Sequence, residues 1–147
     1  MTLSQHTHRV AVNAFVIYKE TFLLLKRANE PFIWGPPGGR LHIDEDPIRG
    51  LQREVLEETG LEIIVFQPIT TWFGLFNDES LLSVDYLCNS DKNTVSLSHE
   101  HSDYRWLTIN DLTQHINIYF SSDLGFKHSA FLLAWQTHLM NLHKNIM

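Results

Sequence analysis

The sequence predicts an α/β domain in which a mixed β-sheet packs between helices. Strand-like and helix-like segments alternate along the chain, and the strand-like segments are rich in Val, Ile and Leu. No linker, low-complexity tract or internal repeat interrupts the alternation. With 147 residues, of which 44% are hydrophobic, the chain has the size and composition of one globular domain, and we expect that domain to span residues 1–147.

The first predicted elements are two strands joined by a turn. Residues 9–18, RVAVNAFVIY, are apolar at nearly every position, which indicates a strand that is covered on both faces. Residues 19–21, KET, form the expected turn, and residues 22–26, FLLLK, form the second strand.

A loop is predicted next, because residues 27–42, RANEPFIWGPPGGRLH, are too rich in Pro and Gly for a helix or a strand. Phe32 and Trp34 are expected to anchor this loop by packing inward. The adjacent glycines Gly38 and Gly39 would let the backbone approach a bound group without an intervening side chain.

A helix is predicted from Pro47 to Thr59. Asp46 can cap the first turn, and proline suits the first helical position. Gly60 can adopt the left-handed conformation just past the end.

The predicted helix has an apolar face and an acidic face side by side. At about 100° per residue, Ile48, Leu51 and Val55 share a narrow arc that should face the core. The adjoining arc carries three carboxylates, which one cation, Arg53, cannot neutralise: Glu54, Glu57 and Glu58. Like charges four residues apart cost about 0.2–0.5 kcal/mol even in water. The arc is therefore either an ordinary solvated face or a site for Mg²⁺ or Mn²⁺, which prefer oxygen ligands.

The later elements complete the alternation. Residues 62–76 and 81–88 are apolar and rich in β-branched residues, and the turn-like NDES between them indicates a long hairpin. Another turn at 91–94 precedes a short strand at 103–109, and residues 126–143 form a closing helix.

Charge and composition limit the classes of partner. The formal net charge of −6 disfavours binding to a nucleic-acid backbone, which usually needs a basic face. An anionic substrate would therefore require a bound metal ion. The single cysteine, Cys88, permits no internal disulfide and is expected to be inert core. The first residues lack the pattern of a signal peptide, and no apolar stretch approaches the roughly 20 residues of a membrane helix, so we expect a cytoplasmic protein.

Residues 39–61 resemble the Nudix box, written G-x5-E-x7-R-E-U-x-E-E-x-G-U with U aliphatic. A chance match in a chain of this size has a frequency on the order of one in ten million. The matching residues are Gly39, Glu45, Arg53, Glu54, Val55, Glu57, Glu58, Gly60 and Leu61.

The resemblance to the Nudix family implies a fold, a reaction and a site. The implied fold is an αβα sandwich with a mixed sheet, and the implied enzymes cleave a diphosphate linkage in a nucleoside diphosphate joined to another group. The implied ligands of Mg²⁺ or Mn²⁺ are Glu54, Glu57, Glu58 and the backbone carbonyl of Gly38. Arg53 is implied to orient the carboxylates, Glu45 to support Arg53, and Gly39 and Gly60 to have structural roles.

Residues outside the box extend the candidate site. Glu100 resembles a glutamate that Nudix enzymes often place near the metals; it is expected to be a ligand or a general base, with an exposed loop acid as the alternative. Glu54 is favoured over Glu100 as the general base, because a base on a helix is held more rigidly. The flanking His99 and His101 are either solvated or supporting residues.

Three further residues are candidates for substrate binding. Arg27 and Arg40 could hold phosphates, with ordinary surface cations as the alternative. Trp34 could stack on a base, although aromatic residues at strand positions are core residues more often than not.

The function predicted from the sequence is metal-dependent pyrophosphohydrolysis of a small nucleotide. A nucleoside triphosphate is favoured, because residues 72–81 lack both the Pro of family members that act on ADP-ribose and the Tyr of those that act on diadenosine polyphosphates. The alternatives are a nucleoside diphosphate linked to a sugar, an alcohol or a second nucleotide, and a catalytically silent domain that senses nucleotides. The oligomeric state is left open, with a homodimer among the alternatives.

Overall fold

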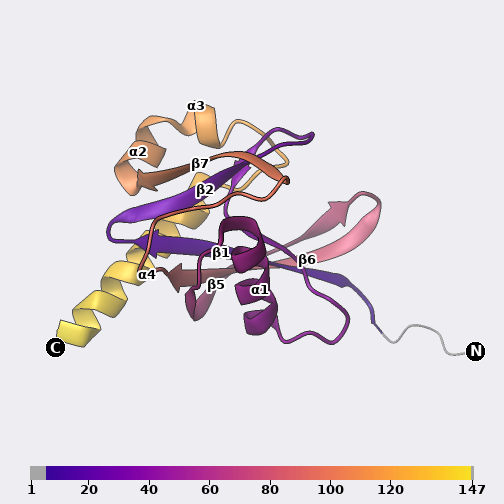
Figure 1. Ribbon diagram of the computed structural model, residues 1–147, viewed down its shortest axis with the longest axis horizontal. Helices are drawn as coiled ribbons and strands as arrows, with labels where there is room; N and C mark the ends of the chain where they lie inside the picture. The colour runs from indigo at the N-terminus through magenta and orange to yellow at the C-terminus, as the bar shows by residue number, and fades with distance from the viewer. Residues whose placement is uncertain (1–5, 147) are drawn as a thin grey trace, which may run out of the picture.

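The computed structural model describes residues 6–146, in which seven strands form one sheet (Figure 1). The first five residues and Met147 of the predicted domain lie outside the described residues. The strands are β1 (Arg9–Tyr18), β2 (Thr21–Arg27), β3 (Trp34–Gly35), β4 (Gly38–Arg40), β5 (Ile64–Phe76), β6 (Glu79–Asn89) and β7 (His101–Thr108). The helices are α1 (Pro47–Thr59), α2 (Ile109–Gln114), α3 (Ile116–Tyr119) and α4 (His128–Ile146).

The sheet is mixed, as predicted. Its strand order is β3-β2-β1-β6-β5, with β4 also paired to β1 and β7 to β2. β1 and β6 run parallel, and the other pairs are antiparallel. β5 and β6 form the long hairpin that the sequence predicts.

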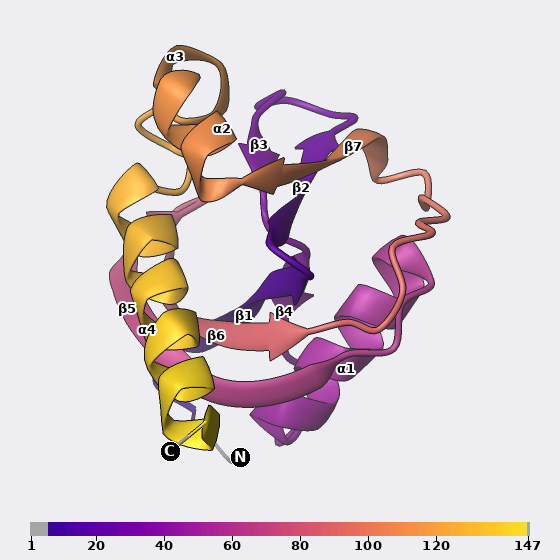
Figure 2. The ribbon, with the colours of Figure 1, turned by 90° about the vertical axis from the view of Figure 1, so that its left-hand side faces the viewer.

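β1 contributes to the core on both faces of the sheet. Successive residues of a strand point to opposite faces. Val12, Ala14 and Val16 therefore pack with α1, whereas Phe15 and Ile17 pack with α4. All five are buried, which explains the nearly unbroken apolar run of this strand. Figure 2 shows α1 and α4 on opposite sides of the sheet, so the αβα arrangement is confirmed.

The predicted ends of α1 are confirmed. The carboxylate of Asp46 accepts a hydrogen bond from the amide of Arg49 at 2.9 Å, and Pro47 occupies the first turn. Gly60 has φ 76°, the left-handed conformation that ends the helix.

The predicted core face of α1 is wrong at one position. Leu51 and Val55 are fully buried, but Ile48 is 44% exposed. Ile48 lies in the first turn, before the part of the helix that packs with β1 and β2. Glu58 takes the next place along the buried face and is only 4% exposed.

The region predicted as a loop contains two short strands, β3 and β4. Trp34 is buried as predicted, whereas Phe32 is 58% exposed, because it precedes β3 and does not join the sheet. Pro37, which precedes β4, does not prevent the pairing of β4 with β1. Proline lacks an amide hydrogen, but here β1 bonds to its carbonyl, which accepts from the amide of Ala14 at 2.8 Å.

Two short helices, α2 and α3, were not predicted. α2 begins with a capping box in which Thr108 and Asp111 bond each other's backbone amides. This pair is readable in the sequence. Because Thr108 caps α2, β7 ends at Thr108 instead of the predicted residue 109. Separately, α4 runs from His128 to Ile146 instead of the predicted 126–143.

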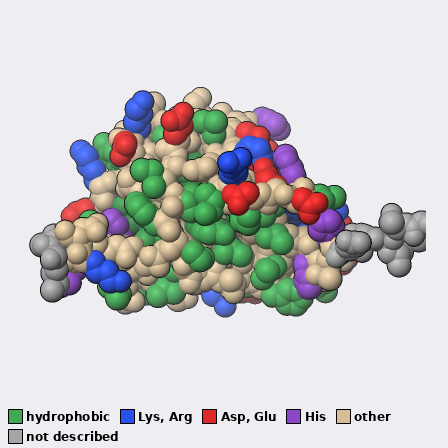
Figure 3. Space-filling model, turned by 90° about the horizontal axis from the view of Figure 1, so that it is seen from below, with side chains coloured by type: hydrophobic (Ala, Val, Ile, Leu, Met, Phe, Trp, Pro, Cys, Tyr) green, Lys and Arg blue, Asp and Glu red, His purple; other side chains and the backbone are tan. Residues whose placement is uncertain are grey.

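β5 forms one edge of the sheet and exposes large apolar side chains. Seen from below, hydrophobic side chains gather across the middle of the surface (Figure 3). The exposed ones on β5 are Ile64, Phe66, Trp72, Phe73 and Leu75. Among the helices of residues 6–146, none combines the length and the apolar character that a membrane span requires.

Candidate metal centre

The acidic residues meet where the end of α1 lies beside the segment that leads into β7. Backbone hydrogen bonds hold this segment in place. The amide of Ser96 donates to the carbonyl of Thr59 at 2.9 Å, and the carbonyl of Glu100 accepts from the amide of Ala28 at 2.9 Å. Glu100 is therefore fixed at its backbone and does not sit on a freely swinging loop.

Arg53 and Glu45 form a bidentate ion pair. Nε of Arg53 donates to Oε2 of Glu45 at 2.8 Å, and Nη2 donates to Oε1 at 2.9 Å. The hydrogen bonds from Arg53 lower the pKa of Glu45 from 4.5 to about 2, and the same bonds raise the pKa of Arg53. Glu45 thus holds the guanidinium in one orientation.

The remaining nitrogen of Arg53 reaches two further carboxylates. Nη1 donates to Oε1 of Glu54 at 3.1 Å and to Oε2 of Glu57 at 3.3 Å. The Glu54 side chain is 15% exposed, whereas that of Glu57 is 59% exposed. One guanidinium therefore links three carboxylates and orients two of them toward the same region.

Gly39 leaves room for Glu54. A Cβ on Gly39 would lie 2.6 Å from the Glu54 carboxylate, a separation that real Cβ atoms essentially never show. Burial raises the pKa of Glu54, and the contact with Arg53 opposes that rise. Glu54 is thus fixed between a cation and a backbone surface.

The backbone of Gly38 faces Glu58. The amide of Gly38 donates to Oε1 of Glu58 at 2.9 Å. Pro37, before Gly38, and Leu41, after β4, both bond to β1. Because bonded residues alternate along an antiparallel pair, the polar groups of Gly38 point away from β1. In an extended strand the carbonyl of a residue points to the same side as its amide, and the Gly38 carbonyl therefore faces α1.

Glu58 carries an uncompensated buried charge when it ionises. Burial raises the pKa of its carboxyl group from 4.5 to about 8; the Gly38 amide opposes the rise, and Glu54, Glu100 and Glu57 add to it by repulsion. No ion pair to Glu58 or Glu100 occurs within the described part of the chain.

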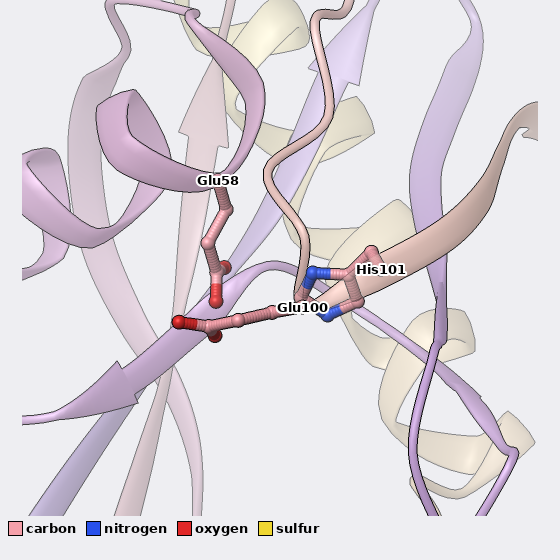
Figure 4. Close-up of side chains that lie close together, drawn as sticks. All are labelled: Glu58, Glu100 and His101. Carbon is pink, nitrogen blue, oxygen red and sulfur yellow. The ribbon is translucent and has the colours of Figure 1, made fainter.

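Glu58, Glu100 and His101 form a compact group. One potential ligand atom from each lies within 4.8 Å of the others. Figure 4 shows the ends of Glu58 and Glu100 beside the ring of His101. Burial lowers the pKa of His101, and the neighbouring Arg27 lowers it further.

A divalent cation fits these residues. The buried Glu58 and the repulsion among its neighbours call for positive charge, which Arg53 supplies only to Glu45, Glu54 and Glu57. Carboxylate and carbonyl oxygens are the ligands that Mg²⁺ and Mn²⁺ prefer. The residues that would hold the ion are Glu54, Glu57, Glu58, Glu100 and the carbonyl of Gly38.

The three candidates for substrate binding have other contacts. Arg27 donates to the carbonyls of its own loop, at 3.1 and 3.3 Å, although it also lies near His101. Arg40 bonds Glu79 at 3.4 Å. Trp34 is 6% exposed and packs in the core with Tyr119, so its ring is not available for stacking on a base.

The sequence comparison decides the family. Residues 7–124 match the model described as NUDIX domain. The chain belongs to the Nudix family. The Nudix chain is 29% identical over 109 residues to a MutT-like protein from Streptomyces ambofaciens, covering 73% of the chain and 68% of that relative. It is 29% identical over 138 residues to an asymmetrical bis(5'-nucleosyl)-tetraphosphatase from Caenorhabditis elegans, covering 86% and 99%. The chain is thereby grouped with the Nudix hydrolases.

Solved structures share the Nudix fold of this chain. A C. elegans Ap4A hydrolase binary complex aligns with a TM-score of 0.71 at 22% identity, covering 90% of this chain and 98% of the other. The MutT protein from Methanosarcina mazei Go1 aligns with a TM-score of 0.67 at 24% identity, covering 76% and 85%.

His101 is predicted from the sequence to be a solvated or supporting residue, but the structure brings it together with Glu58 and Glu100. Its position next to Glu100 in sequence was the available signal. Cys88 is fully buried, and burial raises the pKa of its thiol, as expected for an inert core residue.

Proposed function

We propose that this Nudix hydrolase cleaves a phosphoric anhydride bond of a small nucleotide and depends on a bound divalent metal ion. The observation that carries the proposal is the convergence of Glu54, Glu58 and Glu100, of which Arg53 contacts only Glu54, so that Glu58 and Glu100 have no ion-pair partner among the described residues. A bound Mg²⁺ or Mn²⁺ would polarise the phosphate oxygens and stabilise the charge that develops on them.

Glu54 is the proposed general base. A water oxygen forms a bond to phosphorus, the water proton passes to the Glu54 carboxylate, and the bridging P–O bond breaks so that the leaving phosphate keeps the bridging oxygen. The arrangement favours this role, because Arg53 and Gly39 hold Glu54 in one position. Arg53 and Glu45 act as positioning residues.

Glu100 is the alternative candidate for the general base. Its backbone is fixed beside Glu58. However, its carboxylate has no hydrogen-bond partner among the described residues, so its position depends on a bound ion or substrate. We assign Glu100 to metal binding.

Two classes of substrate are proposed. A nucleoside triphosphate is the first, because residues 72–81 lack both the Pro of family members that act on ADP-ribose and the Tyr of those that act on diadenosine polyphosphates. A dinucleoside tetraphosphate is the second, and it is supported by the C. elegans tetraphosphatase, which is similar over 99% of its length.

A nucleotide panel tests the proposal. Metal-free protein is assayed with Mg²⁺ and with Mn²⁺ against nucleoside triphosphates, dinucleoside tetraphosphates and nucleotide sugars, and the products are separated by chromatography. We expect turnover of at least one of these compounds in the presence of metal. No turnover of any of them would overturn the proposal in favour of a nucleotide-binding role.

A further inference from the structure

His101 presents a nitrogen to the acidic cluster. One of its ring nitrogens lies within 4.8 Å of carboxylate oxygens of Glu58 and Glu100 (Figure 4). Its Nδ1 is buried, and it is the buried side-chain atom without a hydrogen-bond partner among residues 6–146. Buried polar atoms usually have a hydrogen-bond partner, so this half-buried ring, which also offers a nitrogen to two carboxylates, is suited to binding an added group.

The fold fixes the position of this ring. His101 is the first residue of β7 and pairs with Arg27 of β2. Its amide donates to the carbonyl of Ser98 at 3.4 Å. No hydrogen bond joins Arg27 to the ring nitrogen among the described residues; Nε and Nη2 of Arg27 donate to the carbonyls of Pro31 and Glu30.

The separations suit a shared ion. Ligand atoms bound to one such cation lie about 2.1 Å from it. Three atoms that are each 4.8 Å apart lie about 2.8 Å from their common centre, so atoms within 4.8 Å of one another need to move by at most about 0.7 Å each to bind one ion. The side chain of Glu100 can make such a move, because no hydrogen bond among the described residues restrains its carboxylate.

The type of ligand determines which ion is favoured. Mg²⁺ binds oxygen almost exclusively, whereas imidazole suits transition-metal ions. A nitrogen in an otherwise oxygen-based site shifts the preference away from Mg²⁺.

We propose that His101 is a direct nitrogen ligand at this site, together with Glu58 and Glu100, and that the site therefore selects a transition-metal ion of the Mn²⁺, Co²⁺ or Zn²⁺ class over Mg²⁺. The inference rests on the proposed function, since it concerns the same metal centre. It adds a ligand that the Nudix box does not contain.

Metal binding by the full chain tests the inference without reference to activity. Calorimetric titrations with Mn²⁺ and with Mg²⁺ are compared for the metal-free wild type, His101→Gln and the control His99→Gln, whose side chain is exposed. We expect His101→Gln to lose at least tenfold in affinity for Mn²⁺ and less than threefold for Mg²⁺, and His99→Gln to match the wild type. Melting curves of the metal-free variants check that each one folds.

Pulsed electron paramagnetic resonance of the Mn²⁺ complex gives a direct readout. We expect a ¹⁴N coupling to Mn²⁺ in the wild type and in His99→Gln, and none in His101→Gln. Tight Mn²⁺ binding without a nitrogen coupling would overturn the inference and leave the proposed function intact. His101 would then be a half-buried residue next to the metal site or a contact for substrate phosphate. Failure of the wild type to bind either ion would overturn the proposed function as well.

Discussion

Replacing Glu58 by Gln should stabilise the metal-free protein at neutral and alkaline pH. Glu58 is 4% exposed, and burial raises the pKa of its carboxyl group from 4.5 to about 8. The folded state therefore binds this proton more tightly than the unfolded state does. The resulting stability is fully present below about pH 4.5 and is lost as the pH rises through about 8. Glutamine stays neutral and can still accept the hydrogen bond from the Gly38 amide.

The size of the effect follows from this pKa. One pKa unit corresponds to about 1.4 kcal/mol. At pH 7 Glu58 is ionised in the unfolded state but still largely protonated in the folded state, and this difference lowers the free energy of unfolding by about 3 kcal/mol relative to acid pH. Above pH 8 the reduction approaches about 5 kcal/mol. Other groups titrate in the same range, but they are common to both proteins, so the difference between wild type and Glu58→Gln isolates Glu58.

Urea unfolding in excess chelator, from pH 4.5 to 8.5, measures this difference. The two proteins should be equally stable at pH 4.5 and should diverge as the pH rises. Glu57→Gln is the matched control, because the Glu57 side chain is 59% exposed, and it should follow the wild type. Parallel stability curves for wild type and Glu58→Gln would contradict this prediction, since they would show that folding does not raise the pKa of Glu58.

Three further predictions concern the groups around Glu58. Arg53→Lys should lower kcat at least tenfold with little change in the melting curve, because lysine cannot reproduce the bidentate contact with Glu45; near-wild-type kinetics would make Arg53 a simple surface cation. Gly39→Ala should weaken Mn²⁺ binding at least tenfold in calorimetric titrations, because its Cβ would lie 2.6 Å from the carboxylate of Glu54 and displace it; unchanged affinity would show that the Glu54 side chain can move aside without loss of binding. Glu54→Gln should lower kcat at saturating metal by about 10²–10⁴-fold, and Glu100→Gln should lose less. The reverse order would exchange the two roles.

Local patterns predicted much of this molecule. The caps of α1 at Asp46 and Gly60 are visible as residue types at fixed offsets, and the structure has both. Alternate residues of β1 pack in the hydrophobic clusters on the two faces of the sheet, which explains why its sequence is apolar at nearly every position. The arc of Glu54, Glu57 and Glu58 follows from helical spacing alone.

Features set by tertiary contacts were harder to predict. Ile48 shares the helical arc of Leu51, but it does not pack against the sheet and stays exposed. Its exposure depends on how α1 is placed on the sheet, which the helical spacing does not show. Similarly, Phe32 and Trp34 look alike in sequence, and pairing of β3 with β2 buries one of them. The burial of Glu58 beside the adjacent pair Glu100 and His101 depends on backbone hydrogen bonds between α1 and a distant segment. No local pattern reports such bonds.

We propose that the carboxylates around Glu58 hold a metal ion that is required for hydrolysis of a nucleotide anhydride. The most direct measurement follows product release from a nucleoside triphosphate and from a dinucleoside tetraphosphate as Mn²⁺ or Mg²⁺ is titrated into metal-free protein. We expect no turnover in chelator and saturable recovery with metal for at least one substrate, and we expect Glu58→Gln to require much more metal for the same recovery. Full turnover in excess chelator would contradict the proposal.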